Sequence, residues 1–130
     1  MDRLTLVVLA DQFAICRLAP DAAVPAWAWH GAFVSVTRTA EELSIVCDEA
    51  AVPEAVAPVE RGWRALRVAG ALDFALVGIL ARLSAPLAEA GISIFAISTF
   101  DTDYLLVRAA DLAAAIEVLG AAGHDVVALN

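Results

Sequence analysis

Positive charge is scarce in this 130-residue chain. Lysine and arginine together number 8, against 16 aspartates and glutamates, which gives a formal net charge of −8 at pH 7. A surface with this balance repels phosphate backbones, so the composition argues against a nucleic-acid partner. Small cationic or zwitterionic ligands are compatible with it.

Cysteine and histidine are also rare, with two residues of each. Cys16 and Cys47 lie inside apolar runs and form no CxxC pair, so we expect buried free thiols in a reducing cytoplasm. His30 and His124 lie far apart in the sequence, and we expect them to be surface or helix-capping groups. The sequence therefore predicts no metal site and no cofactor.

Long apolar runs and catalytic motifs are missing. The uncharged stretch 22–37 contains Pro25 and Gly31 and is shorter than the ~20 apolar residues that a membrane span needs. The apolar run 4–10 is followed at once by Asp11 and predicts a strand, not a signal peptide. Nucleophile-elbow, zinc-protease and phosphate-loop motifs are absent, so we expect no enzyme; a small enzyme of unrecognised chemistry is the weakest alternative.

Two segments of the chain have the same pattern. Residues 34–46 (VSVTRTAEELSIV) are followed 61 positions later by residues 95–107 (FAISTFDTDYLLV). In this alignment Val34 matches Phe95 and Glu42 matches Asp103. Each segment has an apolar run, a polar turn and a second apolar run. A repeat of this kind predicts two copies of one supersecondary unit.

The first copy is expected to be degenerate. We predict strands at 4–9 and 13–18 around a break at 10–12, at most a short helix at 24–29, and strands at 32–37 and 43–47. Thr39 and Glu42 fit a capping box for one helical turn at 38–42. The stretch 48–62 is the expected linker.

The second copy is expected to be complete. Strands are predicted at 63–68, 92–98, 103–107 and 126–129. A helix should begin at Asp73, be kinked or lose its regularity at Pro86, and stop at Gly91; Asp111 should cap a second helix. The order is β-α-β-β-α-β, so the predicted fold class is α+β, ferredoxin-like, with a degenerate unit at 1–60 and a complete unit at 61–130.

The second copy carries a family resemblance. Its string GISIFAISTFDTDYLLVRAADLAAAIEVLGAAGH is similar to the hallmark segment of small ACT-domain proteins. The earlier segments WAW and FVSVTRTAEELSIVC resemble the N-terminal half of bacterial two-ACT proteins related to the arginine sensors of nutrient signalling. The resemblance implies a regulatory ferredoxin-like module that binds an amino acid at an interface between domains.

The candidate ligand site combines a turn and a helix end. Hydroxyls and carboxylates of the turn at 98–103 can accept hydrogen bonds from an ammonium group, and amides at the Gly91 helix break can bind a carboxylate. Alternatively, the threonines and aspartates of the turn satisfy only the turn itself. The resemblance places these positions in the site, and the predicted ligand-binding residues are Glu89, Gly91, Ile92, Ser93, Thr99, Phe100 and Asp103.

The size of the chain bears on how a ligand site can form. This chain has two units where the arginine sensors have four, so a shared site must form between its units or across a dimer. Because exposed sheet edges favour pairing, we expect a homodimer. The leading hypothesis is a cytoplasmic, non-catalytic sensor of a small ligand of the amino-acid class. The alternative is a structural dimerisation module without a ligand.

Overall fold

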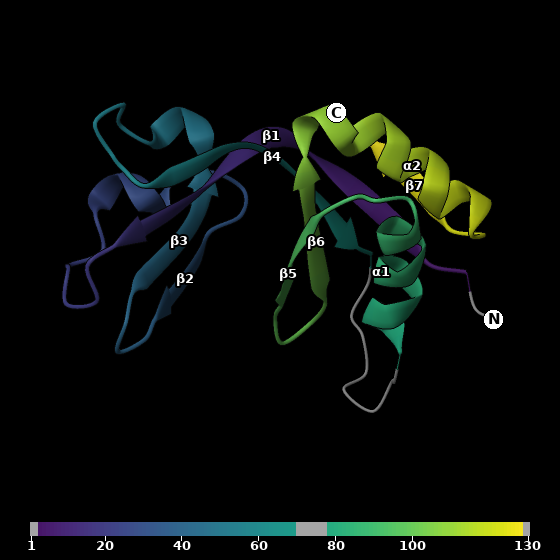
Figure 1. The fold of residues 1–130 in the computed structure, drawn as a ribbon, viewed down its shortest axis with the longest axis horizontal. Coiled ribbons are helices and arrows are strands. Elements are labelled where there is room, and N and C mark those ends of the chain that lie inside the picture. The colour runs from purple at the N-terminus through teal and green to yellow at the C-terminus, as the bar shows by residue number, and fades with distance from the viewer. Residues whose placement is uncertain (1–2, 70–77, 129–130) are drawn as a thin grey trace. The chain divides into compact units, whose positions relative to one another are not determined.

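The computed structural model describes residues 3–69 and 78–128 (Figure 1). The chain divides into two compact units. The C-terminal unit consists of Met1–Ala10 and Arg64–Asn130, and the N-terminal unit consists of Asp11–Trp63. Two long strands, β1 (Thr5–Leu18) and β4 (Val59–Val68), each contribute one half to either unit.

The C-terminal unit has a ferredoxin-like fold. After β4 come α1 (Ile79–Glu89), β5 (Ile94–Ser98), β6 (Asp103–Arg108), α2 (Leu112–Ala121) and β7 (Asp125–Ala128). Its strand order is β7-β1-β4-β6-β5. The predicted order β-α-β-β-α-β and the α+β class are therefore confirmed. The first half of β1 adds a strand between β7 and β4, pairing in parallel with β7.

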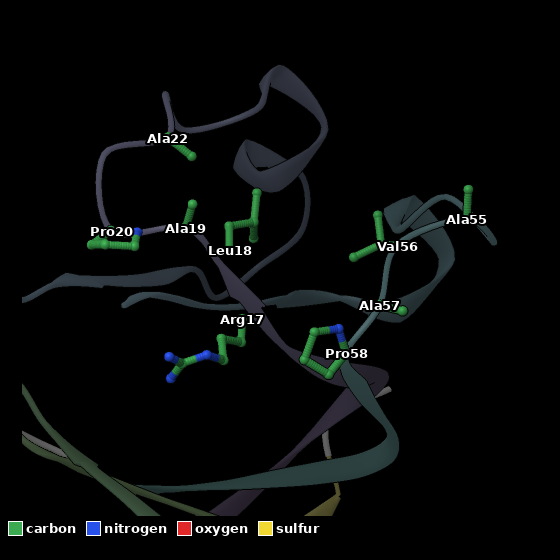
Figure 2. Close-up of a pocket in the computed structure, with 9 residues that line it drawn as sticks. All are labelled: Arg17, Leu18, Ala19, Pro20, Ala22, Ala55, Val56, Ala57 and Pro58. Atoms are coloured by element: carbon green, nitrogen blue, oxygen red, sulfur yellow. The ribbon is translucent and has the colours of Figure 1, made fainter. Parts of the chain in front are cut away.

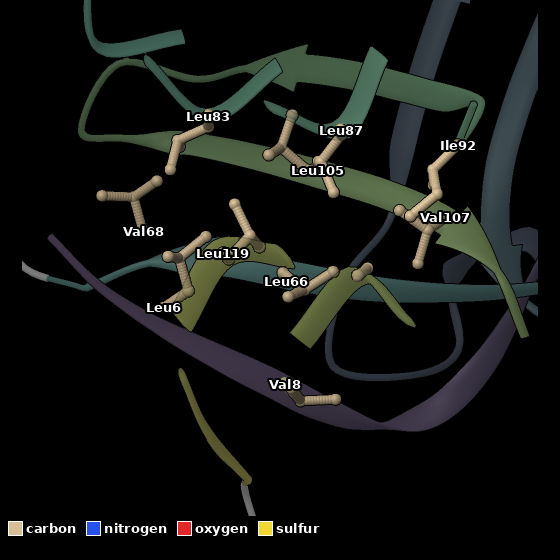
Figure 3. Close-up of a cluster of buried hydrophobic side chains, with 11 residues drawn as sticks. Leu6, Val8, Leu66, Val68, Leu83, Leu87, Ile92, Leu105, Val107 and Leu119 are labelled. Carbon is tan, nitrogen blue, oxygen red and sulfur yellow. The ribbon is translucent and has the colours of Figure 1, made fainter. Parts of the chain in front are cut away.

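The two helices of this unit pack on the sheet through one leucine-rich core (Figure 3). Leu83 and Leu87 lie one turn apart on α1 and so face the same side. They pack with Leu119 of α2 and with Leu66 and Leu105 of the sheet, and all five side chains are fully buried. Burying one such side chain stabilises the fold by about 1.5–3 kcal/mol relative to leaving it exposed.

The N-terminal unit repeats the same order with its helices reduced to single turns. The second half of β1 is followed by η1 (Ala26–Trp29), β2 (Ser35–Arg38), β3 (Leu43–Asp48), η2 (Glu49–Ala51) and the first half of β4. Its strand order is β2-β3-β1-β4. Ala28 of η1 is buried against Leu43, Ile45 and Cys47. The expected short helix near 24–29 is thus a single 3-10 turn.

The strand pairs of the two hairpins correspond with an offset of 60 residues. Arg38 pairs with Leu43 at the end of one hairpin, and Ser98 pairs with Asp103 at the end of the other. The predicted offset of 61 is therefore wrong by one position. Since strand side chains alternate between faces, a slip of one residue exchanges the two faces. In the correct register Asp103 corresponds to the buried Leu43, not to Glu42.

Two strands are longer than expected. The break predicted at 10–12 is absent, because β1 runs without interruption from Thr5 to Leu18. Ala10, Asp11 and Gln12 are exposed, so the polar run marks a stretch of strand that is open to solvent rather than a turn. Likewise β4 begins at Val59, inside the expected linker.

The predicted helix ends need correction. The start of the first helix at Asp73 lies outside the described residues, but α1 continues through Pro86 to Glu89. Pro86 lies in the last turn, and the loss of the hydrogen bond that its nitrogen cannot donate to Arg82 does not end the helix there. Asp111 precedes α2 but makes no side-chain capping hydrogen bond, since a 3-10 turn, η3 (Ala109–Asp111), leads into the helix.

The expected helical turn at 38–42 is a hairpin turn. The Thr39 hydroxyl accepts hydrogen bonds from the amides of Glu41 and Glu42, each at 3.1 Å. The Glu42 side chain does not return to Thr39 as a capping box requires. It instead pairs with Arg17 at 3.6 Å.

Candidate functional site

The turn between β5 and β6 is held by its own threonine. The Thr99 amide donates to the Thr102 carbonyl at 2.8 Å. The Thr99 hydroxyl donates to the same carbonyl at 3.1 Å and accepts from the Thr102 amide at 3.2 Å. Thr39 makes the corresponding three contacts with Glu42 in the other hairpin. Thr99 therefore has a structural task in the turn, as the alternative interpretation of this segment expected.

Beyond its threonine, the β5–β6 turn presents groups that the other hairpin lacks. Phe100 is 81% exposed, where the equivalent residue is Ala40. Asp103 is half-buried, and one of its carboxylate oxygens accepts a 2.6 Å hydrogen bond from the Ser98 hydroxyl. This bond fixes the orientation of the carboxylate and leaves the second oxygen available. An exposed ring beside an oriented carboxylate can contact the apolar and cationic parts of one small molecule.

The turn is anchored to the sheet by Thr102. This side chain is 7% exposed, and its hydroxyl donates a 2.7 Å hydrogen bond to the Val68 carbonyl at the end of β4. Because hydroxyl and carbonyl are both removed from bulk water, each needs this partner. The bond therefore positions Phe100 and Asp103 relative to the sheet.

The helix-end group, Glu89 to Ser93, is built on a Schellman motif. Gly91 has a φ of +76°, its amide donates to Ala88, and the Ile92 amide donates to Leu87 at 2.9 Å. The amides of Gly91 and Ile92 thus already have acceptors and are not available to a ligand carboxylate. Ser93 and Glu89 are exposed, and Ile92 is buried.

The structure does not bring the two predicted groups together within the C-terminal unit. The α1–β5 connection and the β5–β6 turn lie at opposite ends of β5 (Figure 1). At about 3.3 Å per residue, this five-residue strand separates them by roughly 13–17 Å. The ammonium and carboxylate of one amino acid are attached to the same carbon. One such headgroup cannot touch both groups of a single unit.

A groove of about 420 Å³ lies beside the helix-end group, between α1 and the residues that follow α2. Glu89 lines it together with Arg82 and His124, and its remaining walls are three alanines and Pro86. His124 was expected at the surface or as a helix cap. It is instead only 7% exposed, and its Nδ1 accepts a hydrogen bond from the Leu4 amide at 3.2 Å.

Sequence reasoning missed the groove because its residues come from α1 and from the segment after α2, which are far apart in the chain. The available signal was Gly123, which has a φ of +98° and ends α2 as Gly91 ends α1. The His124 amide donates to the Leu119 carbonyl, as Ile92 does to Leu87. The residue after a Schellman glycine is usually packed against the helix. This position therefore predicts burial for His124.

The N-terminal unit has its own groove, of about 440 Å³, between residues 17–22 and 55–58 (Figure 2). Its walls are largely apolar and include Leu18, Val56 and Pro58. The one charged group of the lining, Arg17, already donates to the Glu41 carbonyl and pairs with Glu42. None of the predicted ligand residues lies in this groove.

The two cysteines are free and buried, as predicted. They are neighbours on β1 and β3, and a hydrogen bond joins their side chains. As donor in this bond, Cys47 lowers the pKa of the Cys16 thiol, whereas the bond and burial raise the pKa of Cys47.

Among the described residues, no group of three or more potential ligands is placed to hold a metal ion. Within the same residues, no helix is long and apolar enough to cross a membrane.

Comparison with known proteins identifies two matching segments. Residues 58–121 match the family model of the ACT domain, and residues 11–55 match a model of an N-terminal domain. Over 97 residues the chain is 35% identical to proteins of Homo sapiens and Bos taurus named cytosolic arginine sensor for mTORC1 subunit 1. That match covers 67% of this chain but only 30% of those relatives.

Solved structures extend the comparison to the whole chain. A protein of Agobacterium tumefaciens is 42% identical, with a TM-score of 0.93 over 100% of this chain and 96% of that one. The aspartate kinase of Clostridium acetobutylicum, at 11% identity and a TM-score of 0.66, matches 91% of this chain with 34% of its own length and shows the fold alone. The chain is a member of the ACT-domain family.

Proposed function

We propose that this protein is a non-catalytic regulatory module that binds an amino acid through the β5–β6 turn. The observation that carries the proposal is the difference between its two hairpins. Their turns share the same threonine hydrogen bonds, yet only the second presents Phe100 and Asp103, where the first has Ala40 and the buried Leu43. An exposed ring and an oriented carboxylate on one turn are the groups that a small ligand with an apolar part and an ammonium group would contact.

Each group of the turn has a defined role in this proposal. The free oxygen of Asp103 accepts a hydrogen bond from the ligand ammonium, and the Phe100 ring covers the ligand side chain. Thr99 holds the turn in place. A charge-assisted hydrogen bond contributes about 1.5–3 kcal/mol, so Asp103 is the group whose loss should weaken binding most.

A homodimer would bring the helix-end group into the same site. Within one unit the helix-end group and the β5–β6 turn lie at the two ends of β5. One ligand can therefore contact both groups only where the turn of one copy meets the helix end of a second copy. The edge position of β5 in its sheet gives a surface for such pairing. In this proposal the protein is cytoplasmic, and its two ACT-like units are the compact units Asp11–Trp63 and Met1–Ala10 with Arg64–Asn130, in place of the expected division into 1–60 and 61–130.

Mixing two defective variants tests the dimeric site. Asp103→Asn disables the turn, and Ser93→Phe places a large ring on the exposed helix end. If each site combines two copies, heterodimers contain one intact site, so a one-to-one mixture should regain about a quarter of the wild-type sites. No recovery in a mixture that demonstrably forms heterodimers would contradict a shared site.

A thermal-shift screen with the twenty amino acids tests binding itself. A ligand that binds only the native state raises apparent stability by about 2.7 kcal/mol at a concentration one hundred times its Kd. We expect at least one amino acid to raise Tm in the wild type and to lose this effect in Asp103→Asn. A dimer whose Tm responds to none of them supports the second candidate function, a structural dimerisation module.

A further inference from the structure

The groove between α1 and the end of α2 contains three polar groups of different kinds. Arg82 supplies a guanidinium, Glu89 a carboxylate and His124 an imidazole. All three belong to the C-terminal unit. Glu89 makes no hydrogen bond or ion pair among the described residues. The groove therefore offers both signs of charge within one volume of about 420 Å³.

The imidazole of His124 is held in one tautomer. Its Nδ1 accepts a hydrogen bond from the Leu4 amide, so this nitrogen carries no proton and Nε2 carries one. Nε2 has no hydrogen-bond partner among the residues that the structure describes. It is also not among the fully buried nitrogens without a partner, so it reaches solvent. The residue lines the groove and is more than nine-tenths buried, so the imidazole is held in place beside the groove.

The walls between these polar groups are apolar and shallow. Ala81 and Ala85 lie one helical turn apart on α1, Pro86 adjoins them, and Ala122 closes the other side. Larger side chains at these positions would fill the space. A ligand matched to this lining has an aliphatic body, a carboxylate for Arg82 and His124, and an ammonium group for Glu89.

We propose that this groove binds an aliphatic α-amino acid, with Arg82 and His124 Nε2–H holding its carboxylate and Glu89 its ammonium. The site is distinct from the β5–β6 turn and does not depend on Asp103 or on a second copy of the chain, although it shares Glu89 with the helix-end group of the dimeric site. It gives the C-terminal unit a ligand site composed of its own residues.

Nuclear magnetic resonance of the ¹⁵N-labelled full chain tests this site with L-leucine as the probe. We expect saturable shifts of the His124 ring nitrogens and of the Ala85 and Gly123 amides. Two half-ligands complete the test. 4-Methylpentanoate lacks the ammonium group and 3-methylbutylamine lacks the carboxylate, so each should bind at least about tenfold more weakly than leucine.

Matched substitutions on α1 separate the groove from the rest of the helix. Ala85→Phe fills the groove and should abolish the leucine shifts, while Ala88→Phe places the same ring on an exposed position outside it and should leave them unchanged. Glu89→Gln should remove the preference for leucine over 4-methylpentanoate, and Glu117→Gln on α2 should not. All these variants are at exposed positions, so they should fold.

The proposal fails if leucine produces no saturable shift at these nuclei, or if the shifts persist in Ala85→Phe. It also fails if both half-ligands bind as tightly as leucine. Asp103→Asn distinguishes the two sites: it should leave the groove shifts intact, whereas their loss in this variant would mean that leucine acts through the turn alone.

Discussion

Thr39 and Thr99 occupy the same position in two hairpin turns and make the same three hydrogen bonds to the residue three positions later. Their hydroxyls thus hold the turn in each hairpin. We expect Thr39→Ala and Thr99→Ala each to lower the free energy of unfolding by about 0.5–1.5 kcal/mol, measured by urea denaturation. Serine at either position should restore most of the loss, and a serine variant as unstable as the alanine variant would contradict this role.

The hydrogen bond from Thr102 to the Val68 carbonyl should matter more, because both groups are buried. Thr102→Val keeps the shape of the side chain but leaves the carbonyl without this donor. The expected cost is about 1–3 kcal/mol in urea denaturation. Thr37→Val, at an exposed position of β2, is the control and should change stability little. Equal effects of the two substitutions would refute the anchoring role of Thr102.

Two glycines at the helices of the C-terminal unit should respond to alanine with opposite signs. Gly91 has a φ of +76°, so Gly91→Ala is strained although nothing crowds the added methyl group. We expect a loss of about 1 kcal/mol. Gly120 lies within α2 without a positive φ and with open space around it, so Gly120→Ala should gain about 0.5–1 kcal/mol. Thermal denaturation of both variants measures the difference in sign.

The paired thiols predict a specific pH dependence. The pKa of Cys47 is raised in the folded chain above the ordinary value of 9.0, so the unfolded chain loses this proton first as the pH rises. The stabilisation is complete below pH 9.0 and is lost progressively above it. Because the buried Cys16 would take over this role in Cys47→Ala, the double variant Cys16→Ala/Cys47→Ala is the one that should show a shallower loss of stability at alkaline pH than the wild type.

The single substitution Cys47→Ala should change the other thiol. The hydrogen bond from Cys47 is the largest cause of the lowered pKa of Cys16, ahead of the opposing effect of burial and of the Arg61 charge. Without that donor the pKa of Cys16 should rise. Ultraviolet absorbance of the thiolate, followed against pH in Cys47→Ala and in the wild type, measures the change. An unchanged or lower pKa would contradict the donor role of Cys47.

The fold could be predicted because its helices and strands have clear local signals. The leucine spacing of α1, Gly91 and the alternating runs of β5 and β6 predicted the order of the C-terminal unit, which the structure confirms. The offset of the repeat was harder to predict. Glu42 and Asp103 are both acidic, and aligning them with each other gives an offset that is one residue too long. Only the strand register shows that Asp103 corresponds to Leu43.

The separation of the two candidate-site groups could have been derived from the sequence, because the strand predicted at 92–98 lies between them. The resemblance grouped Glu89 to Ser93 with Thr99 to Asp103, but chain direction places them at opposite ends of β5. The burial of His124 depends on a hydrogen bond to Leu4, 120 residues earlier, and no local pattern encodes such a contact.

The central claim is that Asp103 binds the ammonium group of an amino acid. Isothermal titration calorimetry tests it directly when the groove is filled: Ala85→Phe is compared with Ala85→Phe/Asp103→Asn, using the amino acid that raises the Tm of Ala85→Phe most. Asparagine keeps the acceptor for Ser98 and removes the charge, so Tm without ligand should change little. Loss of about 1.5–3 kcal/mol should raise Kd by roughly tenfold to a hundredfold. An unchanged Kd in Ala85→Phe/Asp103→Asn would contradict the claim.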